Sequence, residues 1–310
     1  MEVKRSVLLI LLLLIAYCGT AQAQPVSKSG VAFDYTRSGD TVDMYDISLA
    51  GAAWYYDYTN RLEPDRPIGV EYVQMIYRPS ATANGNKNPP LKAAANPGST
   101  WLLGNEPDLA VQANMTPAEY AEAYRAAYAA IKSADPTARI FAGGISTVSP
   151  LRLAWLDAML AAYGEEFPAD GWHIHPYILP EACYWGLGYP VGIQPDAAPA
   201  RGCEYGDRHA DYSAFVEQID LFTNWMQGRG VDRPIIVSEY GVLLEQGHGY
   251  SQEVINDYMY GTFAYLDHNP RVERYAWFSV NYEWHPGALF DRNTKQLTAS
   301  GAAYQRYSLR

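Results

Sequence analysis

The sequence predicts an α/β protein with a single domain, a (β/α)8 TIM barrel. Eight short apolar segments occur along the chain, and several are continuously apolar, as in parallel strands covered on both faces. Patterns typical of helices alternate with the later segments, which favours a closed barrel over an open sheet. No G-x-G-x-x-G motif follows the first segment, and this weakens a dinucleotide-binding alternative.

The eight predicted strands are separated by intervals that leave room for helices or long loops. They span Val31–Tyr35, Ala52–Tyr58, Glu71–Arg78, Thr100–Glu106, Arg139–Ser146, Gly171–Tyr177, Pro234–Tyr240 and Tyr275–Asn281. A chain of 310 residues, less a short leader, has the size of one such barrel of roughly 250 residues with some long loops. We therefore expect one domain and no repeat.

Four helices are predicted from the residues at their ends. The clearest begins at Thr116, which can cap it, with Pro117 in the first helical position and Glu119 completing a capping box. The other three span about Pro150–Tyr163, Tyr212–Gln227 and Gln252–Leu266. Residues 81–90 are rich in Asn and Pro and predict a loop, which leaves little room for a long helix after the third strand.

The first 23 residues predict a signal peptide. Lys4 and Arg5 precede the apolar run Val7–Ala16, and residues 21–23, Ala-Gln-Ala, fit a cleavage site. The apolar run is shorter than the roughly 20 residues of a membrane-spanning helix. We expect a secreted mature chain of residues 24–310, extracellular or periplasmic and without a membrane anchor. Lipoprotein anchoring through Cys18 is the alternative.

Two cysteines, Cys183 and Cys203, remain in the expected mature chain. In an oxidising compartment an even pair predicts one disulfide, which would close a loop rich in Gly and Pro. Two unrelated thiols are the alternative. The chain has a net charge of −11 and no basic run, so it is a poor candidate for binding nucleic acid or anionic membranes.

Two predicted strands end in a glutamate, Glu106 in the fourth and Glu239 in the seventh. The carboxyl ends of barrel strands converge, so these carboxylates should face each other across the barrel mouth. Two carboxylates that flank a bond predict glycoside hydrolysis, and we expect Asn105 to donate to a sugar hydroxyl. Asn105 and Glu106 would point to opposite faces of an ideal strand, so the strand should bend before Pro107.

The sixth strand contains His173, His175 and Tyr177, whose spacing of two places them on one face. His175 and Tyr177, nearest the mouth, are predicted to bind substrate, and Tyr177 to form a hydrogen bond with Glu239. His173 fits either a core histidine or a sugar ligand. The His-x-His pair also leaves a metal-dependent hydrolase open, although the sequence shows no third ligand nearby.

Aromatic residues gather near the ends of several predicted strands. Trp54, Tyr56, Tyr77 and Trp277 are candidates to stack on the apolar faces of sugar rings. A single aromatic residue on an apolar strand more often belongs to the core, so the collection carries more weight than any one member.

Three segments resemble motifs of glycoside hydrolase clan A: Asn105–Pro107, Ser238–Gly241 and Tyr275–Phe278. Within the clan, three longer segments are similar to glycoside hydrolase family 128, the group with the alkali-sensitive-linkage-type catalytic core. These are Trp54–Tyr56, Glu71–Met75 and Leu103–Asp108. The similarity covers most of residues 30–285.

The resemblance implies a retaining mechanism with Glu106 as the acid/base and Glu239 as the nucleophile, and hence carboxyl groups roughly 5–5.5 Å apart. It also implies that Asn105 holds the sugar 2-hydroxyl, that His175 and Tyr177 line the −1 subsite, and that Trp277 is its platform. The expected partner is an oligo- or polysaccharide, with no cofactor and no metal, and the protein is expected to be a monomer.

The implied activity is that of an endo-β-1,3-glucanase. Asp57 and Tyr58 depart from the family pattern of Asn and Trp, and so does the long loop between Cys183 and Cys203. Both departures lie where a substrate would bind. Another specificity (xylan, mannan, galactan or mixed-linkage glucan) therefore stays open, and so does a carbohydrate-binding barrel without catalysis.

Overall fold

The structure, a computed structural model, describes residues 27–34, 39–80, 88–244 and 250–310. The predicted signal peptide, Cys18 and Tyr35 lie outside these residues. Within them, no helix is both long and apolar enough to cross a membrane.

The strands form one parallel barrel, which confirms the predicted fold class. They are β1 (Ser29–Ala32), β2 (Trp54–Tyr56), β3 (Glu71–Tyr72), β4 (Gln74–Ile76), β5 (Thr100–Leu103), β6 (Arg139–Ile145), β7 (Gly171–Ile174), β8 (Ile235–Tyr240) and β9 (Val272–Phe278). Their order is β3-β2-β1-β9-β8-β7-β6-β5-β4. Only Val73 separates β3 from β4, so the two ends of this order are halves of one predicted strand, and the barrel closes through them.

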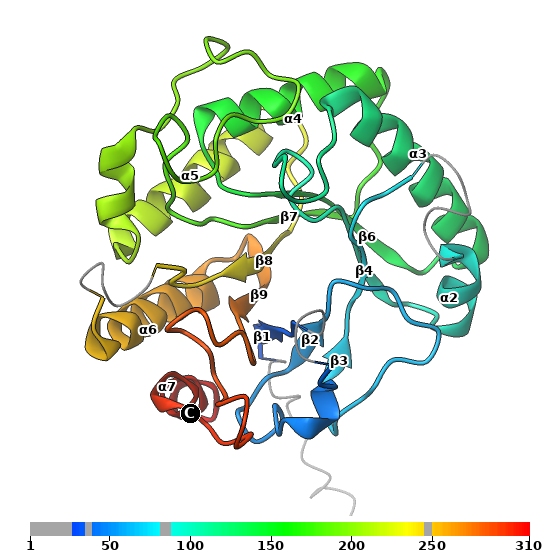
Figure 1. The fold of residues 1–310 in the computed structure, drawn as a ribbon. Coiled ribbons are helices and arrows are strands. Elements are labelled where there is room, and N and C mark those ends of the chain that lie inside the picture. Colours follow the sequence, from blue (N-terminus) through cyan, green and yellow to red (C-terminus); the bar gives the residue numbers. More distant parts are fainter. Residues whose placement is uncertain (1–26, 35–38, 81–87, 245–249) are drawn as a thin grey trace, which may run out of the picture.

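Helices surround the strands (Figure 1). They are α2 (Pro89–Ala95), α3 (Pro117–Ala134), α4 (Pro150–Tyr163), α5 (Tyr212–Arg229), α6 (Gln252–His268) and α7 (Ala299–Ser308), with the 3-10 turns η1 (Val42–Met44) and η3 (Cys203–Arg208). The four predicted helices are α3 to α6. The predicted loop 81–90 lies largely outside the described residues, and the short helix α2 begins within its last two residues. At α3, both bonds of the capping box with Thr116 and Glu119 are present.

The structure also contains α7, another helix that the sequence did not predict. Its segment contains Gly301 and several alanines and has no amphipathic stripe long enough to mark it. Thr298 caps it by accepting a bond from Gly301 N at 3.0 Å. By contrast, the described residues 57–70 between β2 and β3 form no helix, so loops alone connect these two strands.

Alternation along the strands divides the core into two layers. Inward side chains such as Met75, Leu102 and Ile236 fill the barrel, whereas outward ones such as Trp101 and Val237 pack under the helices. This division decides which of the predicted aromatic residues can reach the mouth of the barrel.

Candidate active site

A cavity of about 680 Å³ lies at the carboxyl ends of the strands, within the usual range of ligand pockets. Five residues predicted to bind or act on a ligand line it. They are Tyr77, Asn105, Glu106, Tyr177 and Glu239. The barrel therefore brings both predicted carboxylates into one cavity.

The bend expected at the end of β5 is present. Gly104 has a φ of +101° and Glu106 a φ of +46°, so the chain leaves the strand after Leu103. Glu106 N donates to Gly144 O at 2.8 Å, which anchors the bend to the end of β6. Left-handed backbone is costly for a glutamate and gathers at functional sites. As a result, Asn105 and Glu106 both reach the cavity.

Asn105 brings an unused acceptor to this cavity. The residue is 3% exposed, and its Oδ1 has no hydrogen-bond partner among the described residues. A buried amide oxygen without a partner carries a free-energy cost. A hydroxyl group of a bound ligand would remove that cost.

Glu106 is buried and forms a hydrogen bond with His175, with Nδ1 and Oε1 3.1 Å apart. Burial raises the pKa of Glu106, and the bond to His175 opposes this only in part. Burial lowers the pKa of His175, but the charges of Glu239 and Glu106 outweigh it and raise that pKa overall. A carboxyl group with a raised pKa is suited to donating a proton near neutral pH.

Three tyrosine hydroxyls donate to the carboxylate of Glu239. Tyr56 and Tyr58 reach Oε2 at 3.0 and 2.7 Å, and Tyr177 reaches Oε1 at 3.0 Å. The bond predicted for Tyr177 is thereby confirmed. Burial, followed by the charge of Glu239, raises the pKa of all three phenols well above its ordinary value. The phenols therefore keep their protons and remain hydrogen-bond donors to Glu239.

The two glutamates and His175 form a tight group. One carboxylate oxygen of Glu106, one of Glu239 and one ring nitrogen of His175 all lie within 4.8 Å of one another. These atom types can also hold a metal ion.

Of the two histidines considered for a metal site, only His175 belongs to this group, and His173 lies outside it. Its Nδ1 lies 3.0 Å from Ser238 Oγ, and its Nε2 lies 3.4 Å from Leu103 O. Burial, together with the charge of His175, lowers the pKa of His173 to about 3. It is a neutral histidine of the core.

Two predicted aromatic ligands lie away from the cavity. Trp277 points outward from β9, where it is fully buried and its indole N–H donates to Gly287 O at 2.8 Å. Trp54 points inward, but at the start of β2, where its indole N–H donates to Lys28 O at 3.0 Å. The predictions for both residues are wrong, because Trp277 has outward parity and Trp54 lies at the opposite end of the barrel.

Other residues take their places at the cavity. Phe278, next to Trp277, has inward parity and lines the wall, and Tyr58, two residues after Tyr56, lines it and reaches Glu239. The sequence alone does not show which parity of a strand faces inward, so alternation by itself could not choose Phe278 over Trp277. Asp34, after β1, also lines the cavity and could have been found as a carboxylate at a strand end.

Two tyrosines predicted to stack on a sugar, Tyr56 and Tyr77, lie next to the cavity or line it. Tyr56 is fully buried and meets Glu239, whereas the Tyr77 hydroxyl donates to Gln112 at the rim.

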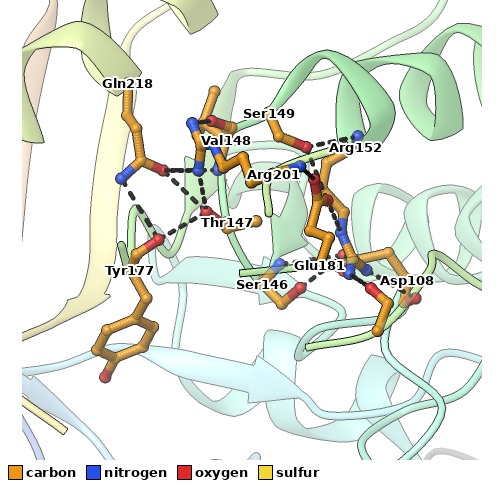
Figure 2. A network of polar contacts seen from close by, with 11 residues as sticks. Asp108, Ser146, Thr147, Val148, Ser149, Arg152, Tyr177, Glu181, Arg201 and Gln218 are labelled. Atoms are coloured by element: carbon orange, nitrogen blue, oxygen red, sulfur yellow. Dashed lines mark hydrogen bonds and ion pairs between the residues drawn. The ribbon is translucent and has the colours of Figure 1, made fainter. Parts of the chain in front are cut away.

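A buried ion-pair network supports one wall (Figure 2). Arg152 is fully buried and pairs with Asp108 at 2.8 Å and with Glu181 at 2.9 Å. Asp108 also accepts from the hydroxyl of Ser146 at 2.8 Å. The network therefore ties the turn that carries Glu106 to the end of β6 and to the loop after β7.

That loop carries the predicted disulfide, since Cys183 and Cys203 are bonded to each other. Arg201, near its end, donates to Thr147 at 2.8 Å, and Thr147 donates to the carbonyl of Tyr177 at 2.6 Å (Figure 2). Leu187, within the loop, lines the cavity. The loop thus forms part of the site.

Comparison with known proteins agrees with this architecture. A family model described as "Glycosyl hydrolase catalytic core" matches residues 30–183 and 205–304. No curated protein matches the chain.

Several solved structures share the fold. One is a family 128, subgroup I endo-β-1,3-glucanase from Amycolatopsis mediterranei in complex with laminaritriose, with 24% identity, a TM-score of 0.65, and 90% of this chain and 99% of that chain covered. Another is a subgroup III curdlan-specific exo-β-1,3-glucanase from Blastomyces gilchristii in complex with glucose, with 23% identity, a TM-score of 0.64, and 91% and 99% covered.

A third is a subgroup II endo-β-1,3-glucanase from Sorangium cellulosum, with 20% identity, a TM-score of 0.62, and 90% of this chain and 97% of that chain covered.

The family match covers most of the chain, and it agrees with the parallel barrel and with the two glutamates at the mouth of the barrel. The chain belongs to the glycosyl hydrolase catalytic core family.

Proposed function

We propose that the protein is a retaining glycoside hydrolase that cleaves β-1,3-glucan within the chain. The observation that carries the proposal is the pair of glutamates, with one oxygen of each within 4.8 Å of the other. This proximity supports retention, for which carboxyl groups roughly 5–5.5 Å apart are typical. The similar structures support the substrate class, because they are β-1,3-glucanases.

In the first step a Glu239 oxygen bonds to the anomeric carbon and the glycosidic C–O bond breaks. The leaving oxygen takes its electron pair and a proton from Glu106, whose raised pKa suits this role. In the second step water attacks the same carbon, Glu106 accepts its proton, and the ester bond to Glu239 breaks. Two inversions leave the anomeric configuration unchanged.

The remaining residues bind and orient the sugar in this proposal. Asn105 Oδ1 accepts a hydrogen bond from a hydroxyl of the sugar at the scissile bond, where the sequence predicted a donor, since this oxygen lacks another partner among the described residues. His175 contacts Glu106 and Tyr177 contacts Glu239, and in this proposal both residues line the −1 subsite. Phe278 takes the place expected for Trp277 as an apolar surface for a sugar ring.

An endo enzyme needs a cleft that is open at both ends. One of the similar structures is an exo enzyme, so the mode of cleavage needs its own test. The test is to incubate the purified protein with laminarin, mixed-linkage glucan, xylan, mannan and galactan. We expect reducing ends from laminarin first, as a ladder of oligosaccharides, with the β-anomer appearing first by NMR. Release of glucose alone would contradict endo action, and an α-anomer that appears before the β-anomer would contradict retention.

Glu239→Ala is expected to abolish turnover of laminarin and to keep the fold, because it removes the nucleophile and leaves the three tyrosines able to bond water. Circular dichroism checks the fold, and azide should restore turnover by replacing the lost carboxylate. Full activity in this variant would refute the assignment of Glu239. Metal analysis and a chelator control test whether the group of Glu106, His175 and Glu239 instead needs a metal ion.

We also propose that residues 1–23 are removed and that residues 24–310 are secreted as a monomer. The disulfide supports secretion, because such bonds persist in oxidising compartments. The mass of the protein recovered from the medium tests the cleavage site, and labelling with palmitate tests the lipoprotein alternative at Cys18. Light scattering gives the oligomeric state.

A further inference from the structure

Tyr58 follows β2 and turns its side chain into the cavity. It has a φ of +61°, in the left-handed region that a tyrosine rarely adopts. Its hydroxyl donates to Glu239 Oε2 at 2.7 Å, the shortest of the three tyrosine contacts to that carboxylate. Costly backbone of this kind persists where the surrounding structure imposes it, often at functional sites.

Contacts of the neighbouring residue, Asp57, hold Tyr58 in this conformation. Its carboxylate is buried, accepts from the hydroxyls of Tyr72 and Thr59 at 2.7 Å each, and pairs with Arg61 at 2.5 Å. Tyr72 belongs to the outer layer of the core, so Asp57 is fastened on the side of β2 away from the cavity. The chain on both sides of Tyr58 is thereby fixed.

The charge on Glu239 changes during the proposed reaction. The carboxylate loses its charge when it bonds to the anomeric carbon and regains it when that bond breaks. A fixed donor favours the charged form, so it assists the step in which the carboxylate leaves. Burial and the charge of Glu239 raise the pKa of Tyr58 well above its ordinary value, so the phenol remains a donor in both steps.

We propose that Tyr58 is a further catalytic residue, which stabilises Glu239 as the leaving group of the second step, and that Asp57 is its positioning residue. The role rests on the proposed glycoside hydrolysis. In that step the water oxygen bonds to the anomeric carbon and its proton passes to Glu106. The bond between that carbon and Glu239 breaks, and the electron pair returns to a carboxylate that Tyr58 already contacts.

The test compares Tyr58→Phe with the wild-type enzyme on 2,4-dinitrophenyl β-laminaribioside, whose good leaving group makes the first step fast. Loss of one bond to a charged group should lower kcat by about 10- to 100-fold. KM should fall in parallel, because the glycosyl-enzyme accumulates. A burst of dinitrophenolate and a mass increase of one glycosyl unit on the intact protein should accompany this.

Asp57→Asn should give the same pattern to a smaller extent. Tyr55→Phe is the matched control, because Tyr55 lies in β2, just before Tyr58, but its hydroxyl donates outward to Asp65 O at 2.6 Å. This control should show the wild-type kcat, KM and level of glycosyl-enzyme. A fall in kcat/KM in Tyr58→Phe without a rise in glycosyl-enzyme above the wild-type level overturns the proposal, and so does such a rise in the control.

A second measurement needs no turnover. Urea unfolding of the wild type, Tyr58→Phe, Glu239→Gln and the double variant forms a double-mutant cycle. The cycle gives the coupling between the two side chains in the folded protein. A coupling of about threefold or more in the unfolding constant supports the contact, and additive effects overturn it. A wild-type enzyme inactive on every β-glycoside would overturn the proposed function and with it the leaving-group role. An active wild type without accumulation in Tyr58→Phe would overturn the role of Tyr58 alone.

Discussion

Burial and the hydrogen bond with His175 together set how the proposed acid/base Glu106 titrates. Burial raises the pKa of Glu106, and the bond to His175 lowers it again in part. A general acid must be protonated, so kcat/KM falls as pH rises through this pKa. The raised pKa therefore moves the alkaline limb of the pH profile to higher pH than an ordinary glutamate would give.

We expect His175→Phe to move this alkaline limb to still higher pH, because it removes the bond that lowers the pKa of Glu106. The rate itself should fall, since Glu106 loses its orienting partner. The measurement is kcat/KM on laminarin between about pH 4 and 9. The exposed His268, on α6, provides the control His268→Ala, which should leave the profile unchanged. A limb that moved to lower pH would contradict the proposed balance of burial and hydrogen bonding.

At the scale of elements, the end of β5 depends on a backbone that only glycine adopts easily. A Cβ atom at Gly104, where φ is +101°, would lie 2.9 Å from the Tyr120 ring and 3.2 Å from Gly143 O. The following residues, Asn105 and Glu106, take their direction from this turn. Local geometry at one residue thus controls the placement of two groups in the cavity.

We expect Gly104→Ala to destabilise the protein by about 1–3 kcal/mol and to lower kcat more than it raises KM. Thermal unfolding and laminarin kinetics measure the two effects. Gly228→Ala is the control, because Gly228 lies within α5 and a Cβ there meets nothing within 4 Å. That change should stabilise the protein by about 0.5–1 kcal/mol and leave the kinetics unchanged. Equal effects of the two variants would contradict the role of the turn.

At the scale of the whole molecule, two long-range connections complete the site. The barrel closes between β3 and β4, which are halves of one segment, and this brings the ends of β2, β5 and β8 around a common mouth. The disulfide closes the loop that brings Leu187 to the cavity, with its cysteines 20 residues apart in sequence.

Removing the disulfide by Cys183→Ser with Cys203→Ser should lower the free energy of unfolding by about 3 kcal/mol, mainly by freeing the unfolded chain. KM should rise because the wall that contains Leu187 loosens, whereas kcat should change little, since Glu106 and Glu239 are held by other contacts. Urea unfolding and laminarin kinetics measure both. A loss of kcat with unchanged KM would contradict this division.

Local signals in the sequence determined the strands, the four longest helices and the two strand-ending glutamates. Thr116 and Glu119 mark a helix start, and apolar runs mark strands, because these preferences act between residues close in the chain. The disulfide also followed from composition and the expected compartment.

Only the tertiary structure decided which aromatic residues face the cavity. Trp277 and Phe278 are adjacent and equally apolar, yet strand parity sends the first under the helices and the second to the cavity. Trp54 points inward, but at the far end of the barrel. Tyr58 reaches Glu239 because contacts with distant residues hold a costly backbone conformation. Position along the barrel axis and strained turns depend on contacts across the whole fold, which local preferences do not encode.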